Sequence, residues 1–112
     1  MRNNLVYGII ESGEKTMASS KEYRDFILEQ LSNLSATSKP MMGEFLIYVN
    51  GVYFGGVFDD RFLVKITDTN KKYNLAKELP YENAKPMFLV DNVDDKEYLE
   101  SLVLDTIKGL KV

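Results

Sequence analysis

The chain has 112 residues, 45% of them hydrophobic and 28% charged, and its formal net charge is −3. This length predicts a single domain that buries roughly two-thirds of its unfolded surface. Neither cysteine nor histidine occurs, which excludes disulfides, zinc sites built from thiolates or imidazoles, and Ser-His-Asp catalysis. The acidic balance argues against direct nucleic-acid binding, because tight contact with phosphates requires a basic surface.

The first sixteen residues differ in character from the rest. Leu5–Ile10 is a short apolar run, residues 11–16 are polar and turn-like, and Met17 resembles a native start. We hypothesise that residues 1–16 are a translated leader, since Gly13-Glu14 can be encoded by a purine-rich ribosome-binding sequence, and that the domain spans residues 17–112. The alternative is a genuine N-terminal strand or arm. No apolar run has the length of a membrane span and no signal-peptide cleavage site is evident, so we expect a cytoplasmic protein.

A first helix is predicted from Ser19 to about Leu34. Ser19 followed by Glu22 forms a capping box, in which each side chain accepts a hydrogen bond from an otherwise unpaired backbone N–H. Apolar residues then recur at helical spacing: Tyr23, Phe26, Ile27, Leu31 and Leu34. Residues 35–38 are predicted to be a linker, and Pro40 prevents the helix from continuing.

The central stretch predicts a three-strand meander. Phe45–Val49 and Val52–Phe58 flank Asn50-Gly51. An Asn-Gly pair between two such runs favours a type I′ hairpin turn, because both turn residues need φ > 0. A third apolar run, Phe62–Thr67, follows the polar turn Asp59-Asp60-Arg61.

The register expected for this hairpin assigns its two faces. A two-residue loop pairs Val49 with Val52, Tyr48 with Tyr53, Ile47 with Phe54 and Leu46 with Gly55. The face expected to meet the helices carries Phe45, Ile47, Val49, Val52, Phe54 and Phe58. The other carries Leu46, Tyr48, Tyr53, Gly55 and Val57, and its tyrosine pair favours a homodimer interface. Alternatively, loops or the N-terminal arm cover this face, or solvent does. Gly55-Gly56 predicts a bulge or a close approach of backbone.

The remaining chain completes the expected fold class. A short helix capped by Asp68 or Thr69 is predicted within residues 68–79, and Met87–Val90 is predicted to be a fourth strand. The last helix begins with a second capping box, Asp94 with Glu97, and ends at Lys108 and Gly109. Its apolar stripe is Tyr98, Leu99, Leu102, Val103, Ile107 and Leu110. We expect an α+β fold of two layers, in which an antiparallel sheet (the three-strand meander plus at least one further strand) packs against the N- and C-terminal helices.

No catalytic, cofactor-binding or metal-binding residue is predicted. Asp91–Asp95 fails as a calcium loop, because Val93, Lys96 and Leu102 stand where an oxygen ligand, a glycine and a glutamate are needed. Asp59-Asp60 is typical of a turn, and no serine has a base to activate it. The predicted strands carry Lys65 as their only basic residue, too few for a surface that stacks single-stranded nucleic acid. We therefore expect a non-enzymatic protein without a cofactor.

A series of short motifs runs from residue 42 to residue 86. Its members are Met42, Gly43, Tyr48, Gly51, Phe54, Asp59, Asp60, Arg61, Lys65, Pro80, Tyr81, Lys85 and Pro86. In their order and spacing these residues resemble the N-terminal domain of the TfoX/Sxy family of bacterial competence regulators. The resemblance extends over nearly all of residues 17–110.

The resemblance implies a role as well as a fold. It implies a single-domain member that acts as a regulatory protein-binding module and assists competence-related transcription regulation through protein contacts. The partner it implies is a transcription regulator, and it offers no catalytic residues; the second copy of the chain is expected from the tyrosine pair on the sheet. The alternative, from a different functional class, is a small-ligand sensor with a pocket between helix and sheet.

Overall fold

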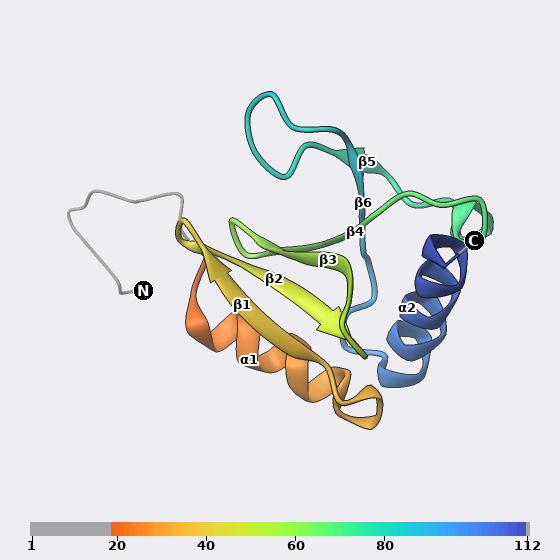
Figure 1. Cartoon of the computed structure of the whole chain (residues 1–112), viewed down its shortest axis with the longest axis horizontal. Helices are drawn as coiled ribbons and strands as arrows, with labels where there is room; N and C mark the ends of the chain where they lie inside the picture. Colours follow the sequence, from red (N-terminus) through yellow and green to blue (C-terminus); the bar gives the residue numbers. More distant parts are fainter. Residues whose placement is uncertain (1–18, 112) are drawn as a thin grey trace.

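The computed structural model describes residues 19–111, so the predicted leader or arm at residues 1–16 lies outside the described part of the chain (Figure 1). Six antiparallel strands form one sheet in the order β1-β2-β3-β4-β6-β5. The elements are α1 Lys21–Gln30, η1 Ser32–Leu34, β1 Thr37–Met41, β2 Glu44–Val49, β3 Val52–Phe58, β4 Arg61–Val64, η2 Lys71–Tyr73, β5 Lys77–Glu78, β6 Met87–Leu89 and α2 Lys96–Leu110. The predicted α+β fold class is confirmed.

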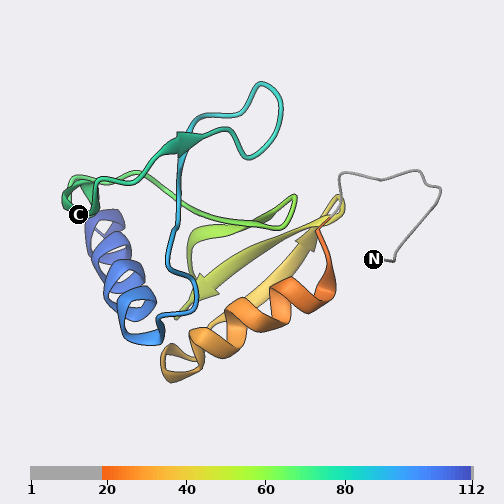
Figure 2. The ribbon, with the colours of Figure 1, turned by 180° about the vertical axis from the view of Figure 1, so that it is seen from behind.

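The main core lies between the sheet and the two helices. Ile27 and Leu31 from the first helical segment, and Leu99 and Leu102 from α2, are fully buried in one cluster with strand residues. Both helices therefore cover the same face of the sheet, which we call the helix face, and the opposite face is the second face. In Figures 1 and 2, α1 lies below strands β2–β4 and the loop between β5 and β6 lies above them.

Three two-residue turns connect the first four strands. Their central residues all have positive φ: Met42 51° and Gly43 87°, Asn50 52° and Gly51 78°, and Asp59 53° and Asp60 55°. Positive φ at both positions is the type I′ geometry, whose twist matches that of the flanking strands. The turn predicted at Asn50-Gly51 is thereby confirmed, and the other two turns share its geometry.

The sheet has two edge strands that were not predicted, β1 at one edge and β5 at the other. Residues 37–38, assigned to a linker, belong to β1, which pairs with β2 from Thr37↔Tyr48 to Met41↔Glu44. Pro40 is accommodated because β1 is an edge strand and needs no second partner. The helix predicted within residues 68–79 is wrong: this segment forms one 3-10 turn, which ends at Asn74 in the left-handed conformation, and then the short strand β5.

A bulge in β3 changes the register predicted for the hairpin. Tyr48 pairs with Tyr53 as expected, but the next pair is Ile47↔Gly55, so that Phe54 is an extra residue. A Cβ on Gly55 would lie 2.3 Å from the backbone oxygen of Leu63, which explains why glycine follows the bulge. The bulge anticipated from Gly55-Gly56 is therefore present, while the pairs Ile47–Phe54 and Leu46–Gly55 are wrong.

Beyond the bulge, the faces assigned to two residues are exchanged. Val57 pairs with Phe45 and Phe62 and is fully buried on the helix face. Phe58 instead packs on the second face in a cluster with Leu63 and Met87. An inserted residue has this effect because side chains in a strand alternate between faces with a period of two.

Both predicted helix starts are early by one residue. The N-cap of α1 is Ser20, whose side chain accepts from Tyr23 N–H at 3.1 Å, and that of α2 is Asp95, which accepts from Tyr98 N–H at 3.1 Å. Ser19 is not free to cap α1, because its hydroxyl donates to Glu44 Oε1 at 2.6 Å and accepts from Asp60 N–H at 3.0 Å. The capping boxes predicted at Ser19 and at Asp94 are therefore wrong.

Gly109 lies inside α2 and does not end it. A Cβ at this position would lie 2.3 Å from Thr69 Oγ1 and 2.6 Å from Thr67 Cβ. The residue is small because the helix packs closely against the segment that follows β4. The helix stop predicted at Gly109 is wrong for this reason.

Candidate functional site

The second face of the sheet carries apolar side chains that neither helix covers. Phe58, Leu63 and Met87 are buried there, and Met41, Leu46 and Leu89 pack against them. An antiparallel sheet with one fully wet face would alternate apolar with polar residues, so another surface is expected to cover this one.

Three of the five residues predicted as an interface lie on this face. Leu46, Tyr48 and Tyr53 are half-buried, and the two tyrosine rings lie 5.7 Å apart between centroids. Gly55 and Val57 are buried on the helix face, where no partner can reach them. The assignment of these two residues to the interface is wrong, and the bulge at Phe54 is the cause.

The loop between β5 and β6 covers part of the second face. The ring of Tyr81 lies 6.2 Å from that of Phe58, measured between centroids. Arg61 fixes the start of this loop: its guanidinium donates to Leu79 O at 3.1 Å and to Pro80 O at 3.2 Å. One of the alternatives considered from the sequence, cover by a loop, thus holds for this part of the face.

Between the loop and the sheet there is an open pocket of about 770 Å³. Its aromatic lining consists of Tyr53, Phe58 and Tyr81. Its remaining lining is aliphatic or basic: Met41, Leu46, Ile66, Pro80, Ala84, Pro86 and Met87, with Lys65, Lys77 and Lys85. No aspartate or glutamate is among these residues, so the charged groups of the lining are all positive.

The basic and aromatic groups of the pocket interact. Lys65 Nζ lies 4.3 Å from the centroid of the Tyr53 ring, within the range of a cation–π contact. The pKa of the Tyr53 phenol is raised above its ordinary value, first by burial and then by Tyr81 and Tyr48. Tyr53 is thus a neutral phenol in the physiological range, and it contributes no negative charge to oppose the lysines.

The family-motif residues fall into two groups in the structure. Those brought together at the pocket are Arg61, Lys65, Pro80, Tyr81, Lys85 and Pro86, with Tyr48 beside Tyr53. Those not brought there are Met42, Gly43, Gly51, Asp59 and Asp60, which form hairpin turns, and Phe54, which is in the main core. The second group shapes the meander, and the first group builds the pocket.

Asp59 and Asp60 form a structural connection between the meander and α1. The Asp60 backbone N–H donates to Ser19 Oγ at 3.0 Å, and the Asp60 carboxylate accepts from Ser20 N–H at 2.8 Å. Ser19 Oγ in turn donates to Glu44 Oε1 at 2.6 Å. These groups are engaged with one another, which agrees with the turn predicted at this position. Among residues 19–111, no group of three or more acidic side chains could hold a metal ion.

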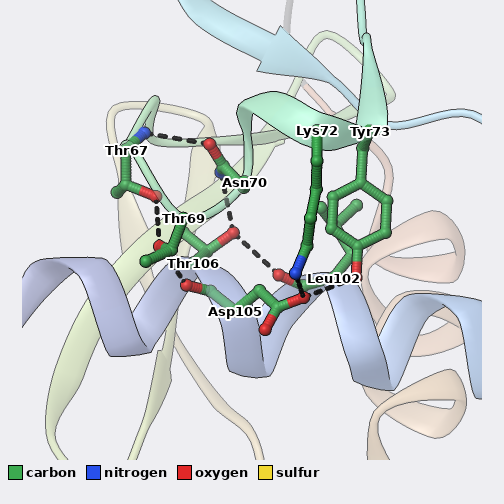
Figure 3. A network of polar contacts seen from close by, with 8 residues as sticks. All are labelled: Thr67, Thr69, Asn70, Lys72, Tyr73, Leu102, Asp105 and Thr106. Atoms are coloured by element: carbon green, nitrogen blue, oxygen red, sulfur yellow. Dashed lines mark hydrogen bonds and ion pairs between the residues drawn. The ribbon is translucent and has the colours of Figure 1, made fainter.

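A second polar network joins α2 to the segment that follows β4 (Figure 3). Asn70 is fully buried there: its Oδ1 accepts from Thr67 N–H at 2.9 Å, and its Nδ2 donates to Lys65 O at 2.8 Å and Thr106 Oγ1 at 2.9 Å. The oxygen and both N–H groups of the Asn70 side-chain amide thus have hydrogen-bond partners. A buried polar group satisfied in this way stabilises one arrangement of the chain.

The outer part of this network contains titratable groups. Tyr73 OH donates to Asp105 Oδ2 at 2.7 Å, and Lys72 Nζ lies 3.3 Å from the same oxygen. Burial and this hydrogen bond raise the pKa of Tyr73 to about 12. The pKa of Asp105 is lowered, chiefly by the hydrogen bond from Tyr73 and then by Lys72. Each group here is matched by another, so we assign the network a structural role.

About half of the residues that line the pocket were singled out from the sequence. No site role was assigned to the others, which are Met41, Phe58, Ile66, Lys77, Ala84 and Met87. The usable signal was the pair of prolines, Pro80 and Pro86, that bound the loop.

None of the helices in the described region is both long and apolar enough to cross a membrane.

The fold and the pocket define a small α+β domain with helices on one face and a loop-covered pocket on the other. No protein-family model matches the chain, and no solved structure matches it. It is 31% identical over 80 residues to an "Uncharacterized 12.7 kDa protein in trpE 5'region" of Spirochaeta aurantia, covering 69% of this chain and 70% of that protein. The chain belongs to the same family as this spirochaete protein.

Proposed function

We propose that this chain is a non-enzymatic regulatory domain that binds a protein partner through the second face of its sheet. The observation that carries the proposal is the apolar second face, which is only partly covered and is bordered by lysines without a carboxylate in the pocket lining. Exposed apolar surface with a polar rim is typical of interaction sites. The resemblance to the TfoX/Sxy N-terminal domain supports a cytoplasmic role in transcription regulation, such as competence, through contact with a regulator.

Two exposed apolar residues provide a matched test of the surface. Tyr81 lines the pocket and is 54% exposed, whereas Leu104 lies on α2 and is 51% exposed. The full chain, as wild type, Tyr81→Glu and Leu104→Glu, is used to capture partners from native lysate with and without nuclease treatment. We expect a stoichiometric protein that is retained by the wild type and by Leu104→Glu but lost with Tyr81→Glu.

Two results would contradict this proposal. Equal capture by all three forms would show that the partner binds another surface. Capture that is lost on nuclease treatment would show that the ligand is a nucleic acid or is bound through one. Thermal unfolding of each variant checks that the loss of capture does not come from loss of folding. The proposed homodimer is tested separately: light scattering of the wild type and of Tyr48→Glu should give a dimer and a monomer.

The size of the pocket favours a second candidate function, a small-ligand sensor. Its volume of about 770 Å³ lies within the range of roughly 300–1,000 Å³ that is common for ligand sites. The predicted place for such a pocket, between helix and sheet, is filled by the buried core, and the pocket lies on the opposite face. Saturable thermal stabilisation of the full chain by a metabolite would support this candidate.

A further inference from the structure

We propose that the pocket on the second face binds a small organic anion with an apolar, preferably aromatic, body. This inference rests on the second candidate function, ligand binding, and names the chemistry of the ligand and the side chains that select it. It follows from the way in which the pocket combines an aromatic floor and roof with three cationic groups.

The apolar part of the ligand is expected to lie between the loop and the sheet. Phe58 and Tyr53 belong to β3 and form the floor, while Tyr81 belongs to the loop and forms the roof. The rings of Phe58 and Tyr81 are in tilted contact, with centroids 6.2 Å apart and planes inclined at 54°. Tyr81 is 54% exposed and Tyr53 is half-buried, so these two rings keep free surface for a flat group beside that contact, and such contacts add to the gain from burying apolar surface.

The charged part of the ligand is expected to meet the lysines. Lys65 follows β4, Lys77 belongs to β5 and Lys85 belongs to the loop, so lysines from three separate elements line the pocket. Among the residues described, none of the three forms an ion pair with a carboxylate. Glu78, the acidic residue next to Lys77, is engaged by Arg61 at 2.8 Å.

The lysines near η2 provide a contrast. Lys71 lies 2.9 Å from Asp68 and Lys72 lies 3.3 Å from Asp105, so the charges of both are matched within the chain. The chain has a net charge of −3, but three lysines and no acidic residue line this pocket. The local charge at the pocket is therefore positive, opposite in sign to the net charge of the chain. A field of this kind selects small anions, while the negative charge of the whole chain disfavours long polyanions.

Two dyes with the same aromatic body provide the test. 1-Anilinonaphthalene-8-sulfonate carries a sulfonate, and N-phenyl-1-naphthylamine lacks it; both fluoresce more strongly in an apolar site. In titrations of the full folded chain we expect the sulfonate to bind at one saturable site at least tenfold more tightly than the neutral dye. The difference should shrink in high salt, because exposed charges are screened.

Variants separate the pocket from the overall charge of the chain. Lys65→Gln with Lys85→Gln should weaken sulfonate binding about tenfold and leave the neutral dye unchanged, as expected for two partly exposed charges. The control, Lys21→Gln with Lys108→Gln, removes the same charge from α1 and α2 and should leave both dyes unchanged. Tyr81→Ala should weaken both dyes together, because it removes the roof and not a cation.

The outcomes distinguish the inference from the function on which it rests. Equal affinity for the two dyes, lost together in Tyr81→Ala, would overturn the anion inference and leave ligand binding intact. No saturable binding of either dye would overturn both. If the control pair weakens the sulfonate as much as Lys65→Gln with Lys85→Gln does, the whole chain's charge is responsible and the assignment to the pocket is wrong.

Discussion

Replacement of Arg61 by lysine tests whether one side chain holds the pocket loop in place. The guanidinium donates from Nε to Phe58 O at 3.1 Å, within its own hairpin. It also reaches the Glu78 carboxylate at 2.8 Å, Leu79 O at 3.1 Å and Pro80 O at 3.2 Å, all at the start of the loop. A lysine ammonium keeps the charge but has one nitrogen, so it can satisfy about one of these sites.

The expected cost follows from the bonds that are lost. Two hydrogen bonds to carbonyl oxygens, at about 1 kcal/mol each, account for roughly 2 kcal/mol. The ion pair with Glu78 adds little, because the two side chains are 28% and 39% exposed and water screens them. A loss of about 2 kcal/mol confined to the loop would raise its open population roughly thirtyfold.

Amide hydrogen exchange detects this change at the loop itself. Ala84 N–H donates to Tyr81 O inside the loop, and Leu89 N–H donates to Ala76 O where β5 and β6 meet. Both amides should exchange faster in Arg61→Lys, and the unfolding midpoint in denaturant should fall. The matched control is Arg24→Lys on α1, whose ion pair is with the neighbouring Asp25 and whose cation–π contact with Phe45 a lysine can also make; it should change stability by less than about 1 kcal/mol. Unchanged exchange at both amides in Arg61→Lys would show that apolar contacts, and not Arg61, hold the loop in place.

Three further predictions concern the junction of α2 with the segment after β4. Gly109→Ala should lower the free energy of unfolding by about 1–2 kcal/mol in thermal melts, although alanine favours helix, because its Cβ would meet Thr69 Oγ1. Asn70→Asp should cost about 3 kcal/mol in denaturant titrations, because two donated hydrogen bonds are replaced by a buried carboxylate. Tyr73→Phe should be less stable than wild type by about 1 kcal/mol below pH 10. Since the fold raises the pKa of Tyr73 from 10 to about 12, this stabilisation is complete below the unfolded value and is lost as the pH rises through the folded one. The stability difference between variant and wild type, followed by denaturation from pH 8 to 12, should therefore shrink at the alkaline end.

The elements with strong local signals were predictable. Both helices carry an apolar stripe at helical spacing, and Asn50-Gly51 strongly favours its turn, so their existence and order follow from the sequence. The helix starts moved by one residue because of tertiary contacts: Ser19 is held by the β1–β2 turn and by Asp60, from 24 to 41 positions away along the chain. A local sequence pattern cannot predict such long-range contacts. Because they occupy Ser19, the N-cap of α1 is Ser20.

The edge strands were not predictable from local patterns. Thr37–Met41 contains a proline and shows no apolar alternation, and its strand character comes from pairing with β2. β5 has only two residues, and it exists because β6 offers it a partner. In both cases the backbone pairing, which depends on distant parts of the chain, determines the structure.

The pocket shows why a candidate site was harder to predict than the fold. Its floor requires Phe58 to lie on the second face, and that placement requires the extra residue Phe54 earlier in β3. Without the bulge, strict alternation would turn Phe58 toward the helices and Val57 toward the loop. The roof requires Arg61 to reach carbonyl oxygens 18 and 19 positions further along the chain. The Gly55-Gly56 pair therefore marks the bulge, and the motif residues from Arg61 onward mark the pocket and its loop, but the directions of Val57 and Phe58 depend on a one-residue shift in register.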